Sequence, residues 1–285
     1  MEHFLDMPDM YTDYKKAYFV ILGVPYDGTS TFVKGADKGP QAIIDASDSI
    51  ELYDIEEDIE TYKHGIHTAV FLNNLESPEK MVKSVYQRVK QYINDNKTLV
   101  LLGGEHSVSI GSIQAHAEKH PDLTVVQLDA HADLRTEYHG SIYNHACVMN
   151  HAQQHANVVQ VGIRSVCVEE KEYIDPQKIF YAHQIHNNYE WMDKAIEQMS
   201  DNVYLSIDLD CFDPSILPST GTPFPGGMTW WQVLAFIDKI NKTKKIVGFD
   251  VVELCPNPAD KSSDVLAAVL VYKIMSKIIK KELSL

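Results

Sequence analysis

The sequence of 285 residues is poor in cysteine and contains no Cys-x-x-Cys pair. A zinc ribbon or a thioredoxin-type redox site is therefore not expected. The four thiols, Cys147, Cys167, Cys211 and Cys255, are expected to be reduced, and either buried or merely structural, as in a cytoplasmic protein. No apolar run is long enough to span a bilayer, and the N-terminus shows no basic segment followed by an apolar stretch. We therefore expect neither a membrane partner nor a signal peptide.

Basic residues are also scarce, because 25 Lys and Arg face 40 Asp and Glu, which gives a formal net charge of −15. Nucleic-acid binding needs a clustered basic surface, so this balance argues against a nucleic-acid partner. An acidic protein favours the approach of a small cationic substrate, although the same charge is common in soluble proteins without that role.

Apolar segments rich in Val, Ile and Leu alternate with amphipathic ones. The former are typical of strands buried on both faces of a parallel sheet. They cover 17–25, 98–104, 124–129, 157–163, 202–210 and 245–253, with weaker candidates at 67–72 and 178–182. Helical patterns cover 78–96, 106–120, 190–199, 229–241 and 262–283. The alternation predicts one α/β domain over residues 1–285, in which the Pro- and Gly-rich segment 218–227 is a loop that shapes a pocket rim.

Carboxylates and imidazoles follow three of the predicted strands. These side chains are His106 after 98–104, Asp129, His131 and Asp133 at the end of 124–129, and Asp208 and Asp210 at the end of 202–210. Ligands of open parallel sheets collect at the carboxyl ends of strands, and residues two apart on an extended chain share a face. We therefore expect three adjacent strand ends to bring all six side chains together.

Four carboxylates packed together would repel one another strongly, and two divalent cations would cancel their charge. Mixed carboxylate and imidazole ligands suit manganese better than a soft, thiolate-preferring metal. Each part is weak alone, because a lone Asp-x-Asp is often a turn or a cap and a lone histidine is often structural. Together they favour a metal-dependent hydrolase. The strand at 245–253 adds Asp250, which we expect to be structural, and Glu253.

Four motifs in these segments resemble those of the ureohydrolase (arginase/agmatinase) family. They are GGEHS at 103–107, LDAHADL at 128–134, SIDLDCFDPSILPSTGTPFPGGMT at 206–229 and FDVVELCP at 249–256. The segments 23–43 and 141–149 resemble the agmatinase branch, so the resemblance extends over nearly the whole chain. It implies a three-layer α/β/α fold with a mostly parallel sheet, two Mn²⁺ per subunit, and hydrolysis of a guanidino group to urea and an amine. It also implies a homo-oligomer, commonly a trimer or hexamer.

The resemblance further implies that the six side chains above are the metal ligands, that His145 is the catalytic histidine and that Glu253 faces the substrate. Hydroxide shared by two metals would attack the guanidinium carbon. A histidine would then protonate the leaving nitrogen, but the residues alone do not separate His139, His145 and His151. Glu253 can accept two hydrogen bonds from the planar guanidinium, or it can simply cap a neighbouring loop.

Two departures from the arginase pattern favour a substrate without an amino-acid head. The segment 134–145 has Arg135 in place of an asparagine-containing pattern, and 160–173 lacks the aspartate pair of arginases. Agmatine fits, with putrescine and urea as products, a step of polyamine biosynthesis. Glu169 or Glu170 would receive its ammonium, although such a pair often only complements a helix dipole.

Other functions stay open at this point. The same chemistry can act on aminopropylagmatine, guanidinobutyrate, formiminoglutamate or arginine, and the carboxylate-bearing substrates would need a basic pocket, for which Arg135, Arg164 and Lys34 are available. A two-metal phosphatase would need more Arg and Lys near the metals than the ligand loops contain. A structural metal site in a non-enzymatic protein would be closed and four-coordinate.

Overall fold

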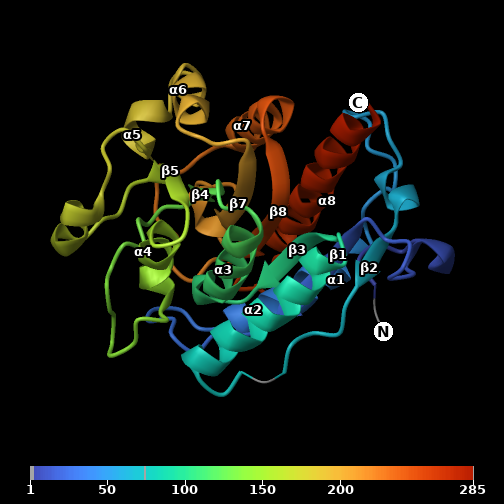
Figure 1. The fold of residues 1–285 in the computed structure, drawn as a ribbon, viewed down its shortest axis with the longest axis horizontal. Coiled ribbons are helices and arrows are strands. Elements are labelled where there is room, and N and C mark those ends of the chain that lie inside the picture. Colours follow the sequence, from blue (N-terminus) through green and yellow to red (C-terminus); the bar gives the residue numbers. More distant parts are fainter. Residues whose placement is uncertain (1–2, 74, 285) are drawn as a thin grey trace.

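The computed structural model describes residues 3–73 and 75–284, and a single eight-stranded sheet forms its centre (Figure 1). The strand order is β2-β1-β3-β8-β7-β4-β5-β6, and every neighbouring pair is parallel. The strands are β1 (Phe19–Val24), β2 (Ile66–Thr68), β3 (Thr98–Gly103), β4 (Thr124–Leu128), β5 (Asn157–Ile163), β6 (Ile179–Tyr181), β7 (Asn202–Asp208) and β8 (Lys245–Val252).

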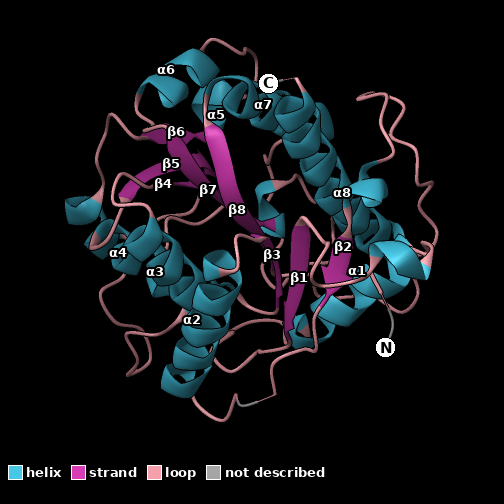
Figure 2. Cartoon of the chain, turned by 45° about the vertical axis from the view of Figure 1, so that its right-hand side comes forward, coloured by secondary structure: helices cyan, strands magenta, loops and turns pink. Residues whose placement is uncertain are grey.

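Helices cover both faces of this sheet (Figure 2). Side chains of α2, α3 and α4 belong to the core on one face, and those of α1, α6, α7 and α8 belong to the core on the other. The helices are α1 (Gly39–Ser47), α2 (Pro78–Asn94), α3 (Ser109–Lys119), α4 (Val148–Gln153), α5 (Ala182–Ile185), α6 (Trp191–Glu197), α7 (Trp230–Thr243) and α8 (Ser262–Leu283). Short 3₁₀ helices cover Asp9–Tyr11, Ala36–Lys38, Thr61–His64, His106–Val108, His145–Cys147, Val168–Tyr173 and Leu209–Cys211. The predicted three-layer α/β/α fold is confirmed.

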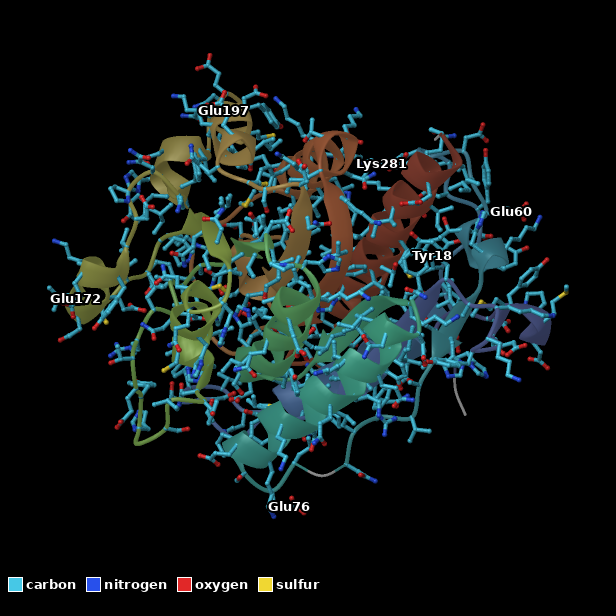
Figure 3. All side chains as sticks on the ribbon, in the orientation of Figure 1. Tyr18, Glu60, Glu76, Glu172, Glu197 and Lys281 are labelled. Carbon is cyan, nitrogen blue, oxygen red and sulfur yellow. The ribbon has the colours of Figure 1, made fainter. Side chains whose placement is uncertain are left out.

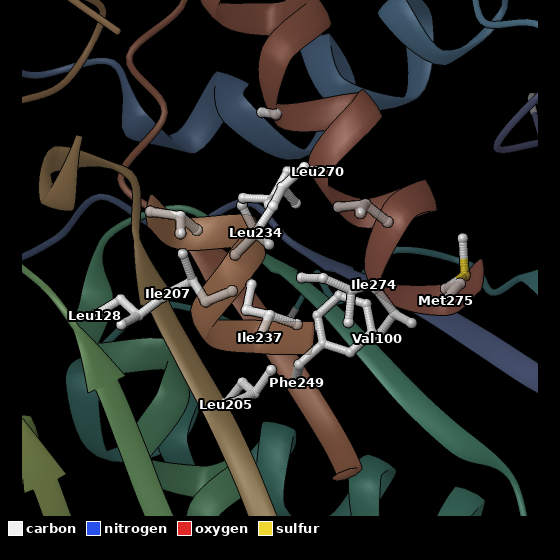
Figure 4. Close-up of a cluster of buried hydrophobic side chains, with 14 of the residues drawn as sticks. Val100, Leu128, Leu205, Ile207, Leu234, Ile237, Phe249, Leu270, Ile274 and Met275 are labelled. Carbon is white, nitrogen blue, oxygen red and sulfur yellow. The ribbon is translucent and has the colours of Figure 1, made fainter. Parts of the chain in front are cut away.

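Alternating side chains of each strand feed these two cores. Leu205 and Ile207 of β7 and Phe249 of β8 pack toward the layer that contains α7 and α8 (Figure 4). Tyr204, which directly precedes Leu205 in β7, faces the opposite core, to which α2 and α3 contribute. Because both faces are covered by helices, the strands need no polar face, which explains their nearly continuous apolar sequences.

A strand lies in each of the six strong candidate segments and in both weak ones, although β2 includes only the first two residues of 67–72. A helix lies in each predicted helical segment. The segment 106–120 begins as a 3₁₀ turn over His106–Val108 before α3 starts. Three helices, α1, α4 and α5, were not predicted. They have nine, six and four residues. Helices this short depend on tertiary packing rather than on a readable periodicity.

The acidic residues divide into a surface population and a buried one. Glu172 and Glu197, for example, lie at the outer boundary of the molecule (Figure 3). The buried acids are Asp54, Glu105, Asp129, Asp133, Glu170, Asp208, Asp210, Asp250 and Asp264. Most of these follow or end the central strands, so buried negative charge is concentrated at one edge of the sheet. No helix of the described residues is long and apolar enough to cross a membrane.

Candidate metal centre and active site

The site lies at the carboxyl ends of the four central strands, β3, β8, β7 and β4. His106 follows β3, Glu253 follows β8, Asp208 ends β7 and Asp129 follows β4. The expected adjacency of the three ligand-bearing strands is wrong, because β8 pairs with both β3 and β7 and separates them. Strand-end residues indicate the edge of a parallel sheet at which a side chain emerges, but they carry no information about the lateral order of the strands. The intervening strand places Glu253 inside the ligand cluster.

Two groups of converging donor atoms share the carboxylate of Asp129. They consist of His106, Asp129 and Asp208, and of Asp129, His131 and Asp210, with the donor atoms of each group within 4.8 Å of one another. Asp133 adjoins the first group, since its Oδ2 lies 3.0 Å from His106 Nδ1. The six residues proposed as ligands therefore meet at one place, and the shared carboxylate suits a pair of neighbouring cations.

The ring of His106 gives the clearest sign that this cluster fits a metal. Its Nε2 lies 2.9 Å from Ser206 Oγ, and the Ser206 hydroxyl donates to Asp250 Oδ1 at 2.9 Å. Since that hydroxyl proton points at Asp250, Ser206 accepts the proton of Nε2. Nδ1 is then a bare lone pair. It is buried without a hydrogen-bond partner among the described residues, although Asp129 Oδ2 lies only 3.1 Å away. A lone pair facing carboxylates is stable when a cation lies between them.

The protonation of the cluster reflects its surplus of negative charge. Burial, followed by the charges of Asp210 and Asp129, raises the pKa of Asp208 well above its usual range. Burial and the charge of Asp129 raise the pKa of Asp133 to about 7. Burial alone would lower the pKa of His131, but Asp210 and Asp129 outweigh it and raise the pKa to about 11. The protein alone thus favours extra protons here, and bound divalent cations would take their place.

Two site residues have a left-handed backbone, with φ of 53° at Asp133 and 67° at Glu253. Such angles are uncommon for residues other than glycine, and they cluster at functional sites where the surrounding structure holds them. The backbone N–H of Glu253 donates to the carbonyl of Gly104 at 2.8 Å. The carbonyl of Asp133 accepts from the backbone N–H groups of Met149 at 2.9 Å and Asn150 at 3.2 Å. Both carboxylates are thereby aimed by the fold rather than by regular strand geometry.

The cluster opens into a cavity of about 280 Å³, which both His145 and Glu253 line. His139 and His151 are not among its lining residues, and His151 Nε2 instead contacts the carbonyl of Ile142 at 3.0 Å. Of the three histidines left open by the sequence, His145 is therefore the one at the cavity. Burial, followed by the charges of His106 and His131, lowers the pKa of His145 to about 4.

The side chain of Glu253 lines the cavity and is anchored to the backbone of His106. Its Oε1 accepts the backbone N–H of His106 at 2.7 Å. Burial, and next the charge of Glu105, raise the pKa of Glu253 well above its usual range. A carboxylate has about four lone-pair positions, so this single anchor leaves Glu253 able to accept further hydrogen bonds from a molecule in the cavity.

Thr29 contacts His145, Glu105 contacts Thr29, and neither residue was singled out from the sequence. Thr29 Oγ1 lies 3.1 Å from His145 Nδ1 and 2.7 Å from Glu105 Oε2. Both residues stand within segments that carry the family resemblance, 23–43 and 103–107. Their residue types give no signal by themselves, because the contacts join parts of the chain that are far apart in sequence.

The two glutamates proposed to bind a substrate ammonium occupy different environments. Glu170 is buried and lines the cavity, and its two carboxylate oxygens accept the backbone N–H groups of Leu134 and Cys167, each at 2.8 Å. Glu169 is exposed and is not among the lining residues. Glu170 thus caps the start of the 3₁₀ helix Val168–Tyr173, and its carboxylate keeps lone pairs to spare at the cavity wall.

The basic residues near the cavity are mostly engaged. Arg164 donates to several backbone carbonyls, among them those of Asp210 at 2.6 Å and Phe224 at 2.7 Å. Lys34 Nζ donates to the carbonyl of Asp27 at 2.8 Å. Only Arg135 of the three candidate cations lines the cavity, with its guanidinium 4.6 Å from the centre of the Tyr138 ring. The basic pocket that a carboxylate-bearing substrate would need is therefore small.

The segment 218–227 is a loop and forms part of the cavity wall, as the sequence predicts. Gly221 and Thr222 line the cavity, and the Thr222 hydroxyl donates to Asp210 Oδ2 at 3.2 Å. Asp213 Oδ2 holds the far end of the loop by accepting the backbone N–H groups of Gly226 at 2.8 Å and Gly227 at 3.1 Å. The loop is thus tied directly to a proposed metal ligand.

Comparison with known proteins places this site in a family. The model of the arginase family matches residues 17–276. The chain is 35% identical to N(1)-aminopropylagmatine ureohydrolase of Synechocystis sp. over 277 residues, which cover 93% of this chain and 90% of that protein. It is 33% identical to an agmatinase of Pyrococcus horikoshii, with 95% of both chains covered.

Among solved structures, agmatine ureohydrolase of Thermoplasma volcanium superposes with a TM-score of 0.89 at 30% identity. The superposition covers 100% of this chain and 96% of that one. The sequence match and the fold match thus extend over the same strands and the same strand-end loops that build the cluster. On these grounds the chain belongs to the arginase family.

Proposed function

We propose that this protein hydrolyses the guanidino group of an amine-bearing substrate and releases urea. The observation that carries this proposal is the cluster of four aspartates and two histidines, joined through Asp129, at the floor of a cavity that His145 and Glu253 also line. Relatives named as ureohydrolases and agmatinases support the same reaction class. A closed structural metal site would offer no such cavity beside its ligands.

The chemistry assigns each residue a role. The six ligands would hold two divalent cations, for which manganese suits the mixed oxygen and nitrogen donors. When bound, such cations lower the pKa of water and so supply hydroxide at neutral pH. Glu253 would accept hydrogen bonds from the planar guanidinium and fix its orientation. His145 would carry a proton to the leaving nitrogen, because an unprotonated amide anion is too basic to leave.

Agmatine is the proposed substrate, with putrescine and urea as products. Three observations support a cationic tail rather than a carboxylate: the net charge of −15, the engagement of Arg164 and Lys34 with backbone carbonyls, and Glu170 at the cavity wall. Aminopropylagmatine is a second candidate, because relatives that are 35% and 36% identical to this chain bear that substrate in their names.

A urea-release assay with a panel of guanidino compounds tests this proposal. The protein is first stripped with a chelator, then reloaded with Mn²⁺, and assayed with agmatine, aminopropylagmatine, guanidinobutyrate and arginine. We expect activity on one or both amine-bearing compounds and little on those with a carboxylate. Full activity of thoroughly metal-free protein would refute the metal centre. Exclusive turnover of guanidinobutyrate would instead assign Arg135 to a substrate carboxylate.

We further propose a cytoplasmic homo-oligomer, a trimer or hexamer. The family membership supports this assembly, and so do large apolar side chains at the surface, such as Phe32, which is 75% exposed, and Trp231, which is 64% exposed. Light scattering coupled to size-exclusion chromatography gives the mass directly. A monomer at all concentrations would contradict the proposal.

A further inference from the structure

The hydroxyl of Thr29 contacts three groups, which are the carboxylate of Glu105, the ring of His145 and the backbone of His145. It lies 2.8 and 2.7 Å from the two carboxylate oxygens of Glu105 and 3.1 Å from His145 Nδ1. It also accepts the backbone N–H of His145 at 3.0 Å. Thr29 follows β1, Glu105 follows β3, and His145 begins the 3₁₀ helix His145–Cys147. One hydroxyl thus ties three separate segments together directly beside the proposed proton carrier.

The one proton and two lone pairs of the Thr29 hydroxyl each have one neighbouring group as a partner. A threonine hydroxyl has one proton to donate and two lone pairs that accept. The carboxylate of Glu105 takes the proton, and the backbone N–H of His145 takes one lone pair. The remaining lone pair faces His145 Nδ1, so the ring nitrogen must be the donor. The other ring nitrogen, Nε2, is then the one left for proton exchange.

Glu105 is held in place to accept that proton. It is fully buried, and its Oε2 also accepts the backbone N–H of Thr29 at 2.8 Å. The hydroxyl of Ser107 donates to Oε1, and that of Ser30 lies 3.4 Å from Oε2. The backbone N–H of Glu105 donates to the carbonyl of Tyr26 at 2.8 Å. These contacts fix the carboxylate from several sides.

We infer that Thr29 is a positioning residue that sets the proton-carrying state of His145. Its hydroxyl, oriented by Glu105, keeps a proton on Nδ1 and presents Nε2 to the cavity. This inference rests on the proposed function, in which His145 exchanges a proton with the leaving nitrogen. An imidazole can do so at one nitrogen only when the other is held in the complementary state. Thr29 itself need not touch the substrate.

Kinetics of three variants test this role. Thr29→Val keeps the shape of the side chain and removes the hydroxyl, and Thr29→Ser keeps the hydroxyl. Because positioned acid–base catalysis contributes about 10²–10⁴-fold, we expect Thr29→Val to lower kcat by about 10- to 100-fold, with bound manganese unchanged and KM changed by less than about 3-fold. Thr29→Ser should recover kcat to within about 3-fold of wild type. Thr61→Val is the matched control, since its buried hydroxyl bonds Ser276 Oγ at 2.8 Å, away from the site.

Two kinetic outcomes for the Thr29 variants would overturn the inference. One is a wild-type kcat in Thr29→Val. The other is a Thr29→Ser variant as slow as Thr29→Val, because the hydroxyl would then not be the determining group. A kcat loss of the same size in Thr61→Val would also count against it, since any buried threonine hydrogen bond would then have the same effect.

Neutron diffraction of the manganese-loaded wild-type protein gives a readout that needs neither turnover nor a variant. We expect deuterium on His145 Nδ1, directed at Thr29 Oγ1, and the Thr29 hydroxyl deuterium directed at Glu105. A bare Nδ1 that accepts from Thr29 would overturn the inference. If the wild-type protein released no urea from any guanidino compound, the proposed function would fail, and the neutron map would still decide whether Thr29 holds the proton of His145.

Discussion

Ser206 provides the sharpest test of the proposed metal centre, because it is not a ligand and yet determines the state of one. Its hydroxyl lies between His106 Nε2 and Asp250 Oδ1, at 2.9 Å from each. Ser206→Ala removes this connection without touching a proposed ligand atom. His106 is then free to carry its proton on Nδ1, and its ring loses the contact that aims Nδ1 at the cluster.

The structure sets the size of the expected effect. Loss of a hydrogen-bonding partner behind a metal-binding histidine typically weakens metal affinity about 10- to 100-fold, which corresponds to about 1.4–2.7 kcal/mol. The variant should also lose about 1–3 kcal/mol of unfolding free energy without metal, because Nε2 loses its acceptor in a buried site. Asp250 keeps the Tyr204 hydroxyl at 2.8 Å and the Ile207 N–H at 3.3 Å, so the effect should centre on His106.

Calorimetric titration of metal-free protein with Mn²⁺ measures the affinity, and urea unfolding measures the stability. Ser276→Ala is the matched control, because Ser276 is also fully buried and its hydroxyl donates to the Tyr272 carbonyl at 2.9 Å, outside the site. We expect the control to lose stability but not manganese affinity. A folded Ser206→Ala protein that binds manganese as tightly as wild type would refute the argument that Nδ1 is the metal-facing atom.

Three further predictions follow from the site and the core. His145→Ala should lose most turnover while its manganese content, measured by atomic absorption, stays at the wild-type value; loss of metal would make His145 a ligand instead. Glu170→Gln should raise KM for agmatine more than KM for butylguanidine, which lacks the ammonium, and Glu169→Gln tests the exposed candidate in the same assay; equal changes for both compounds would exclude ammonium binding. Burial lowers the pKa of His116 to about 4 from 6.5, so the unfolded chain takes up the proton first as the pH falls between these values. His116 should therefore remove up to about 3 kcal/mol from the unfolding free energy over that interval. Urea unfolding at pH 7 and pH 5 should show a smaller loss for His116→Gln, and an equal loss in both proteins would contradict the assignment.

The sequence predicts much of the fold because the sheet is buried on both faces. Segments such as 124–129 and 202–210 have no polar alternation, so they are recognisable without knowledge of their partners. The same strand-end reasoning brings Asp129 and Asp208 together. The order of the strands could not be predicted in this way. No residue pattern within 245–253 indicates that this strand lies between 98–104 and 202–210.

The residues that orient the site are also invisible in the sequence. Ser206 and Thr29 are ordinary hydroxyl residues, and they matter through His106 and Glu105, which are 100 and 76 residues away along the chain. The left-handed backbone of Glu253 could not be predicted from the sequence either, because glutamate has no preference for that conformation. The sequence therefore predicts the charged groups at the centre of the site, but not Ser206, Thr29 and Glu105, which surround them.

The position of β8 between β3 and β7 has a consequence for how the protein matures. Leu99 of β3 pairs with Gly248 of β8, a contact that closes a loop of about 150 residues, and such closures are slow. During synthesis β8 leaves the ribosome after both β3 and β7. Until β8 docks, β3 and β7 have no common neighbour, and their ligands cannot form one cluster. Metal uptake should therefore be among the last events of folding, and a chain that stops before β8 should hold no cation pair.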